Sequence, residues 1–370
     1  MNIACDARAL VGRHTGVGTW TTQVMAGLAA DSSTRILLGA SKALDLPEAL
    51  NLPNVEVLPR PPLPLPGSVW LHLALGNALR RAQAEVFIGS LAILPRRCPI
   101  PAIAMVHDLT PRTHPERHTL KTRMTFNPFI EGSLRAARAV VVGSEATRSE
   151  VLRLYPWVEN RLHQIGYGVD VFFSPAEDEI EGERTRTQFA GGRPYILHMG
   201  TLEPRKGLVT LVEAWDRLQE LVPDTPNLVL AGGEGWDMGP LVERINSSPH
   251  HDRIYRPGYV TQDQARSLMR HARVFVLASE VEGFGLPLAE AIACGAPCVA
   301  SDVPALRESG TDAAVFVPVG DAEALARAMA ESLEPGTALA MRKASITRRS
   351  ALSWDPIIDL WWELIHSVVG

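Results

Sequence analysis

Short apolar runs alternate with helix-length segments twice along this chain of 370 residues. The first set of runs covers 2–5, 35–38, 55–58, 86–88, 102–106, 139–142 and 163–165. The second covers 195–199, 227–231, 254–256, 274–277, 298–300 and 314–317. Helical patterns lie between them, at 20–30, 128–137, 208–221, 239–246, 261–271, 288–294 and 322–333. This alternation predicts βαβ units, and therefore an α/β protein of two Rossmann-like domains whose parallel sheets face a central cleft.

The length of the chain also favours two domains over one. Residues 1–172 are expected to form the first domain and 195–353 the second. The charged stretch 173–194 has no clear apolar period and is the candidate linker. Residues 354–369 carry apolar side chains at helical spacing, which predicts a helix that packs back on the first domain.

Composition excludes several classes of function. The net charge of −5 gives no basic field for nucleic acid. The four cysteines are scattered without metal-ligand spacing, so no zinc site is expected. Neither a signal peptide nor a run of membrane-spanning length is present, which predicts a cytoplasmic protein. No feature of the sequence sets an oligomeric state.

The segment from Glu282 to Pro297 is the most specific motif, Glu-Gly-Phe-Gly-Leu-Pro-Leu-Ala-Glu followed by Ala-Ile-Ala-Cys-Gly-Ala-Pro. It follows an apolar run and leads into a helix, so Glu282 lies in a strand-to-helix loop and Glu290 on the first turns of the helix. The glycines allow backbone N–H groups to approach a ligand. Carboxylates repel phosphate but accept hydrogen bonds from hydroxyls, which predicts a site for a nucleotide sugar.

Two glycine-rich turns follow other strands of the second half. One carries the adjacent cations Arg205 and Lys206, which suit a diphosphate. The other carries Gly233, whose backbone N–H group is expected in an anion-binding nest. An exposed basic turn and a flexible loop are the alternative interpretations.

In the first half, Gly16 and Gly18 precede a predicted helix, and His107 follows an apolar run. Glycines before a helix let backbone reach an anion, and strand carboxyl ends bind ligands in open α/β sheets. An ordinary tight turn and a solvated loop histidine are the alternatives.

Together these motifs resemble the retaining glycosyltransferases of the GT-B fold, family 4 type, which include bacterial mannosyltransferases of surface polysaccharide and lipopolysaccharide assembly. The resemblance is strongest across 195–321. It implies that Glu282 contacts the transferred sugar and that Glu290 accepts the ribose hydroxyls. It also implies that the backbone of Phe284, Gly285 and Leu286 borders the sugar and phosphates.

The resemblance further implies that Lys206, with Arg205, neutralises the diphosphate. His107 would lie by the transferred sugar, and Gly16 and Gly18 would let the first domain approach the donor. Many relatives carry an arginine where this chain has Thr201, so Arg205 is the candidate to replace it.

The expected reaction is sugar transfer from a nucleoside diphosphate to a hydroxyl of a glycan or lipid-linked acceptor, with retention and without a metal or other cofactor. GDP-mannose is the favoured donor, and UDP-sugars are the alternative. The resemblance favours a departing phosphate oxygen that assists the acceptor, whereas a nucleophilic Glu282 is the other mechanism. An epimerase, an inactive nucleotide-sugar-binding subunit and a dehydrogenase are further alternatives, the last lacking the third glycine after Gly18.

Residues 60–81 combine a proline-rich stretch with an apolar and basic one. A loop followed by a packed helix is the first interpretation. The second is a surface that meets lipid at the inner membrane face.

Overall fold

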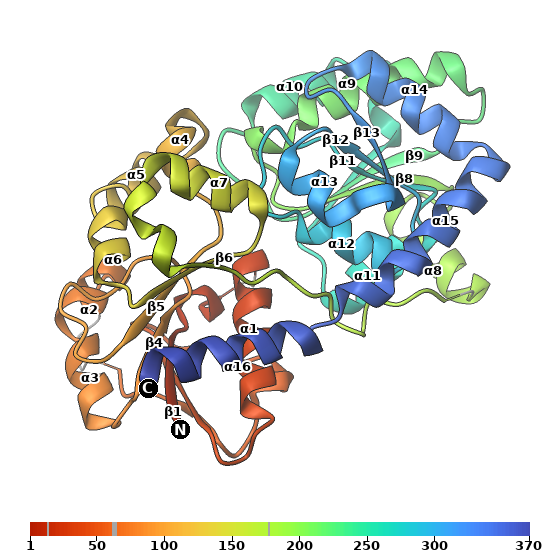
Figure 1. Cartoon of the computed structure of the whole chain (residues 1–370). Coiled ribbons are helices and arrows are strands. Elements are labelled where there is room, and N and C mark those ends of the chain that lie inside the picture. The colour runs from red at the N-terminus through yellow and green to blue at the C-terminus, as the bar shows by residue number, and fades with distance from the viewer. Residues whose placement is uncertain (13–14, 61–64, 177) are drawn as a thin grey trace. The chain divides into compact units, whose positions relative to one another are not determined.

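The computed structural model describes residues 1–12, 15–60, 65–176 and 178–370. The chain divides into two compact units (Figure 1). The first comprises residues 1–168 together with 354–370, and the second comprises 169–353. Each unit contains one parallel sheet, which confirms the predicted α/β class.

The sheet of the first unit has seven strands in the order β3-β2-β1-β4-β5-β6-β7. The strands are β1 (Asn2–Asp6), β2 (Arg35–Gly39), β3 (Val55–Val57), β4 (Val86–Gly89), β5 (Ala102–Val106), β6 (Ala139–Val142) and β7 (Leu162–Gln164). All seven match predicted apolar runs. The strand order reverses between β1 and β4, and open α/β sheets bind ligands outside the carboxyl ends of the strands at such a reversal.

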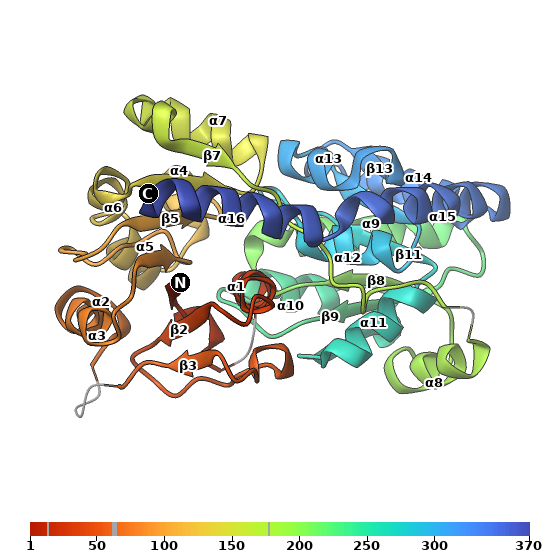
Figure 2. The same ribbon diagram turned by 60° about the horizontal axis from the view of Figure 1, so that its bottom comes forward.

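Helices cover both faces of this sheet. They are α1 (Gly16–Ala29), α2 (Gly67–Leu73), α3 (Leu75–Arg81), α4 (Thr110–Thr113), α5 (Leu120–Phe126), α6 (Ile130–Ala136), α7 (Glu145–Leu154) and α16 (Asp355–Val369). On one face, Phe87 and Val140 share a core with Trp70 of α2 and Leu134 of α6. Helices α1 and α16 pack together (Figure 2), and they contact β2 and β4 respectively. The rings of Trp20 and Trp361 lie 5.6 Å apart between them.

The apolar and basic segment packs into the core as its first interpretation predicted. It forms two helices, and Trp70, Leu71, Leu75 and Leu79 are buried. Only Leu73 is strongly exposed among these apolar side chains, at 74%. Most of the apolar surface offered for lipid contact is therefore core, while residues 61–64 of the segment lie outside the described residues.

The sheet of the second unit has the order β10-β9-β8-β11-β12-β13, which reverses between β8 and β11. Its strands are β8 (Tyr195–Met199), β9 (Asn227–Ala231), β10 (Ile254–Gly258), β11 (Val274–Leu277), β12 (Cys298–Ser301) and β13 (Ala314–Val317). Its helices are α8 (Glu179–Phe189), α9 (Leu208–Leu221), α10 (Gly239–Asn246), α11 (Gln262–His271), α12 (Leu286–Ala293), α13 (Pro304–Gly310), α14 (Ala322–Leu333) and α15 (Pro335–Arg349). Helices α9 and α14 share a core with one face of the sheet, and α11 and α12 contact β8 and β11.

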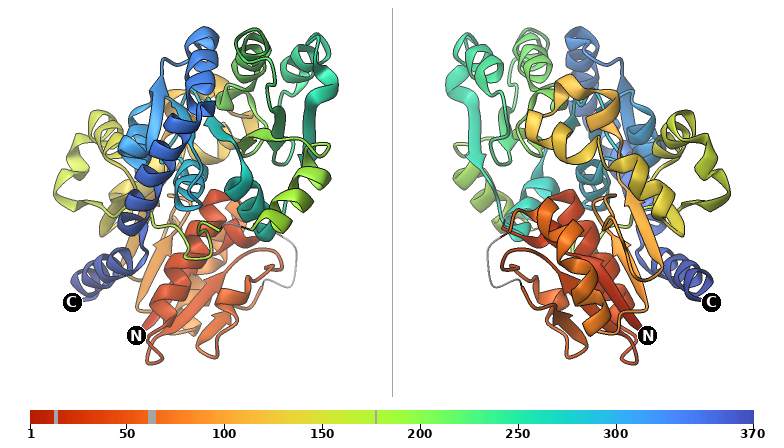
Figure 3. Two further views of the ribbon diagram at one scale, coloured as in Figure 1. Left: turned by 90° about the vertical axis from the view of Figure 1, so that its right-hand side faces the viewer. Right: turned by 90° about the vertical axis from the view of Figure 1, so that its left-hand side faces the viewer.

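The segment predicted as a linker belongs to the second unit instead, and half of residues 173–194 forms α8. This helix buries only Gly182, Thr185 and Phe189, so its sequence shows no apolar stripe. It lies beside α11 (Figure 3). Polar contacts hold the two helices together, including His271 Nε2 to Glu181 Oε2 at 2.9 Å.

Among the described residues, no helix combines the length and the apolar character needed to cross a bilayer.

Candidate functional site

A cluster of charged side chains lies where the second sheet reverses its strand order. Arg205 and Lys206 belong to the 3₁₀ turn Pro204–Lys206 after β8, and Glu282 lies in the loop after β11. Lys206 Nζ donates to Glu282 Oε1 at 2.5 Å, and Arg205 Nη1 donates to Glu282 Oε2 at 3.1 Å. Ser279 Oγ also donates to Glu282 Oε1, at 2.7 Å. The structure therefore brings Glu282 together with two cations that lie more than seventy positions before it in the sequence.

Burial and charge act in opposite directions on this cluster. Burial alone raises the pKa of Glu282, but Lys206 and Arg205 outweigh it and lower that pKa to about 2. Burial lowers the pKa of Lys206, while Glu282 opposes the shift. Arg205 also donates from Nε to Glu203 Oε1 at 2.5 Å, so two carboxylates face the two cations. Glu203 was not identified from the sequence. Its position two residues before Arg205 was the one signal that could have indicated it.

Two glycines shape the loops that carry Lys206 and Glu282. Gly207 has φ +62°, and a Cβ there would lie 2.0 Å from the carbonyl oxygen of Ala278. Gly285 has φ +91° and caps α12, and a Cβ there would lie 2.3 Å from Leu306 Cδ2. A side chain at position 207 would force apart the loops that carry Lys206 and Glu282, whereas one at position 285 would strain the start of α12 and press on α13.

The residues beside Gly285 turn their side chains into the core. Phe284 and Leu286 are each only 9% exposed. The role expected for them requires backbone groups only, which is compatible with these buried side chains.

Glu290 lies in α12, away from the cluster of cations. Burial, and then the nearby charge of Asp170, raise the pKa of Glu290 to about 8. Hydrogen bonds donated to the charged carboxylate, such as those from ligand hydroxyls, would lower this pKa again.

Gly233 lies in the loop after β9. Its carbonyl oxygen accepts from the backbone N–H of Leu202 at 2.9 Å, and Leu202 in turn accepts from Gly235 N at 2.9 Å. Backbone hydrogen bonds thus link the turns after β8 and β9. The anion-binding role of Gly233 stays a prediction.

In the first unit, His107 follows β5 and is half-buried, with both ring nitrogens in hydrogen bonds to the protein. Its Nε2 lies 2.8 Å from the carbonyl oxygen of Ser90, and its Nδ1 lies 2.7 Å from Tyr167 Oη. A carbonyl only accepts, so Nε2 carries the proton and Nδ1 accepts from the tyrosine. Burial lowers the pKa of His107 to about 4, although the Ser90 carbonyl and Asp108 act against this shift. The ring is therefore neutral at physiological pH, and its edge contacts Trp20 with ring centroids 5.0 Å apart.

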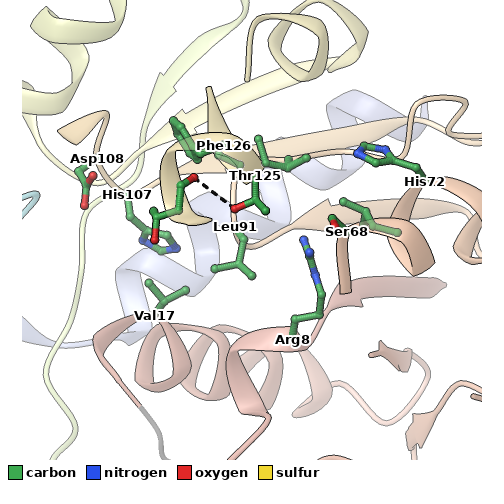
Figure 4. A pocket seen from close by; sticks show the side chains of 13 residues that line it. Arg8, Val17, Ser68, His72, Leu91, His107, Asp108, Thr125 and Phe126 are labelled. Carbon is green, nitrogen blue, oxygen red and sulfur yellow. Dashed lines mark hydrogen bonds between the residues drawn. The ribbon is translucent and has the colours of Figure 1, made fainter. Parts of the chain in front are cut away.

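A pocket of about 270 Å³ opens beside His107 (Figure 4). His107 and Asp108 lie at one end and His72 at the other. Arg8 also lines it and is fixed by buried Asp6, with Nη2 to Oδ2 at 2.6 Å. The remaining lining combines hydroxyl and apolar groups, from Val17, Ser68, Leu71, Leu91, Ala92, Ile93, Thr122, Thr125 and Phe126.

Gly16 and Gly18 lie on either side of Val17, one of the pocket residues. Both belong to the first turn of α1, not to a turn before it, because the helix begins at Gly16 instead of Trp20. The backbone N–H groups of this turn lie at a helix N-terminus, where anions are favoured.

Within the described ranges, no group of three or more histidine, cysteine, aspartate or glutamate side chains is arranged to hold a metal ion.

Comparisons with known proteins agree with this geometry. Residues 179–348 match the family model described as glycosyl transferases group 1, and residues 14–172 match glycosyltransferase family 4. The chain is 27% identical over 358 residues to O-antigen chain mannosyltransferase B of Escherichia coli, covering 92% of this chain and 93% of that protein.

Solved structures show the same fold. Sucrose-phosphate synthase from Thermosynechococcus elongatus superimposes with a TM-score of 0.79 at 21% identity, covering 100% of this chain and 99% of the other. Anabaena HepE in complex with UDP-glucose gives a TM-score of 0.79 at 19% identity, covering 99% of this chain and 100% of the other.

Proposed function

The chain belongs to the glycosyltransferases of the GT-B fold, and we propose that it transfers a sugar, with retention, from a nucleoside diphosphate to a hydroxyl of a glycan or lipid-linked acceptor. The product would enter surface polysaccharide synthesis. The favoured donor is GDP-mannose, since the E. coli relative is named a mannosyltransferase. UDP-sugars are the second candidates, because HepE was solved with UDP-glucose.

The observation that carries this proposal is the ion cluster of Lys206, Arg205 and Glu282 at the strand reversal of the second sheet. In the free protein, the cations and the carboxylate bind each other. A nucleotide sugar offers each of them a replacement partner: phosphate oxygens for the cations, and sugar hydroxyls for the carboxylate.

The same cluster supports a role in catalysis. The leaving diphosphate gains negative charge as the glycosidic bond breaks, and fixed cations stabilise that charge more than they stabilise the ground state. We propose that Lys206 and Arg205 supply the positive charge that a metal ion supplies in other transferases.

Glu282 suits a sugar-binding role better than a nucleophilic one. Both of its oxygens accept from cations, and a pKa of about 2 makes it a weak base and a weak nucleophile. Retention would then depend on a departing phosphate oxygen that assists the acceptor hydroxyl on the same face of the sugar.

The acceptor is proposed to bind in the pocket of the first unit. Its hydroxyl-bearing and apolar lining suits a sugar, which presents hydroxyls at its edge and C–H groups on its faces. His107 borders this pocket as a neutral, oriented ring.

The test is a thermal-shift panel with GDP, UDP, ADP and their sugars, followed by a transfer assay with the donor that stabilises the protein most. A ligand that binds the folded state raises the melting temperature according to its affinity. Stabilisation by one nucleotide diphosphate and its sugar, with activity that resists EDTA and an α-linked product from an α-linked donor, is the expected result. No stabilisation by any nucleotide would overturn the donor site, and activity lost to EDTA and restored by Mg²⁺ would overturn the metal-free mechanism.

A further inference from the structure

His198 lies inside the second sheet at its strand reversal. It belongs to β8, is fully buried, and has a side chain that reaches across to β11. Its Nδ1 lies 3.1 Å from the carbonyl oxygen of Val276. Since that oxygen only accepts, Nδ1 carries the ring proton and Nε2 presents a lone pair.

Nε2 of His198 has no hydrogen-bond partner among the described residues. A buried polar atom without a partner is uncommon in native proteins and calls for an explanation. Burial, and then the charge of Lys206, lower the pKa of His198 to about 4, so the lone pair is present at physiological pH.

The space beside Nε2 is shared with the Lys206 ammonium. A Cβ placed on Gly200 would lie 3.7 Å from His198 Nε2, 3.7 Å from Lys206 Cε and 3.9 Å from Lys206 Nζ. Gly200, with φ +151°, therefore leaves open a small volume that both nitrogens border. A water molecule or a shift of the lysine side chain would join the acceptor to the ammonium.

Building on the proposed function, we propose that His198 is a positioning residue, whose Nε2 accepts a hydrogen bond from Lys206 and directs its ammonium to the donor diphosphate. In the free protein, Glu282 holds this ammonium. When a sugar engages Glu282, the lysine needs another acceptor to stay in place. A neutral imidazole orients the ammonium without cancelling its charge, whereas a second carboxylate would compete with the phosphates.

Two substitutions separate the functions of the two ring nitrogens. His198→Asn places an amide N–H near Nδ1 and keeps a donor for Val276, but removes the acceptor at Nε2. His198→Gln extends to the position of Nε2 and keeps an acceptor there. Binding of GDP and of UDP to each purified variant is measured by calorimetry, together with kcat, KM and the melting temperature.

We expect His198→Asn to weaken binding of the preferred diphosphate about tenfold, the size of one hydrogen bond to a charged group. His198→Gln should stay within about threefold of the wild type. In a Lys206→Met background, His198→Asn should have little further effect, because the partner it positions is absent. A merely structural role for His198 would weaken binding equally in both backgrounds.

Equal binding by His198→Asn and the wild type would overturn the positioning role, as would an equal loss in His198→Gln and His198→Asn. If His198→Asn does not fold, His198→Met, which lacks a strong acceptor, is compared with His198→Gln by the same criteria. A wild-type protein that binds neither GDP nor UDP would instead contradict the proposed function itself.

Discussion

The two units have sheets of the same design but carry different chemistry at the carboxyl ends of their central strands. In the second unit, between β8 and β11, Lys206 and Arg205 face Glu282 and Glu203. In the first unit, the neutral ring of His107 is held between Ser90 and Tyr167 after β5. The ions are paired with each other in the absence of a ligand, whereas the histidine has both of its nitrogens satisfied by the protein.

This difference leads us to expect that the ion cluster serves mainly turnover and that the histidine network serves mainly folding. Buried ions can exchange their internal partners for the charged and polar groups of a ligand. Removing such an ion should therefore affect turnover more than folding. A neutral histidine whose two ring nitrogens are both hydrogen-bonded within the protein has no ring nitrogen left to bind a ligand. Its removal should affect folding at least as much as turnover.

The largest expected effect is that of Lys206→Met. Loss of the buried ammonium should lower kcat/KM by about 10²–10³-fold, the cost of losing one group that stabilises transition-state charge. Glu282 keeps its bonds to Arg205 and Ser279, so the variant should still fold. Steady-state kinetics, with a melting curve as the folding check, measure both quantities.

Lys343→Met, on the exposed side of α15, is the matched control and should match the wild type. Wild-type turnover by Lys206→Met at saturating donor would show that this lysine does not serve the diphosphate.

An intermediate effect is expected for Glu290→Gln, and it depends on pH. The pKa of Glu290 is raised to about 8 in the folded protein, from about 4.5 when unfolded. The folded state therefore holds a proton that the unfolded state releases, and wild-type stability falls as the pH rises from about 4.5 to 8. Glutamine has no such loss, so the variant should become relatively more stable across this window, by a few kcal/mol at pH 8, because each pKa unit is worth about 1.4 kcal/mol.

Melting temperatures of both proteins between pH 5 and 9 measure this difference. Glu183→Gln, on the exposed side of α8, is the control. A stability difference that stays constant with pH would contradict the raised pKa of Glu290.

The smallest effect is expected for Tyr167→Phe in the first unit. His107 Nδ1 loses the hydroxyl that donates to it, which should lower the free energy of unfolding by about 1–2 kcal/mol. We expect the network mainly to hold the histidine ring in place, so kcat should fall less than about tenfold. Urea denaturation and steady-state kinetics give the two values, with Tyr155→Phe in the same unit as the control.

If Tyr167→Phe lowered kcat a hundredfold or more, the expected difference between the two units would be contradicted. It would indicate that His107 acts in catalysis and not mainly in folding.

The sequence was sufficient for the strands and for the helices with an apolar stripe. Helix α9 buries Leu211, Trp215 and Leu218 at helical spacing, and its predicted bounds match the structure. Helix α15 buries only Met341 and Ser345, so its sequence has no apolar stripe from which the helix could be predicted. Helices of this kind are stabilised by polar contacts and by small buried residues, which leave no period in the sequence.

The site shows the same limit. Glu282, Lys206 and Arg205 were identified from motifs, because each follows an apolar run in a glycine-rich turn. Glu203 was overlooked although it lies beside Arg205, since its importance comes from its ion pair. His198 looked like part of a buried strand, and only the neighbouring β11 shows which of its nitrogens lacks a partner.

The sequence by itself determined the α/β class, the family and the residue types available for chemistry, because apolar periodicity and motif spacing are local properties of the chain. Tertiary structure alone decided how these residues are paired and charged. The pKa of Glu282 is low because of Lys206, which lies 76 positions away, and His107 is neutral because β5 and its neighbours bury it. Charge and hydrogen bonding depend on distance in space, and only the folded chain sets that distance.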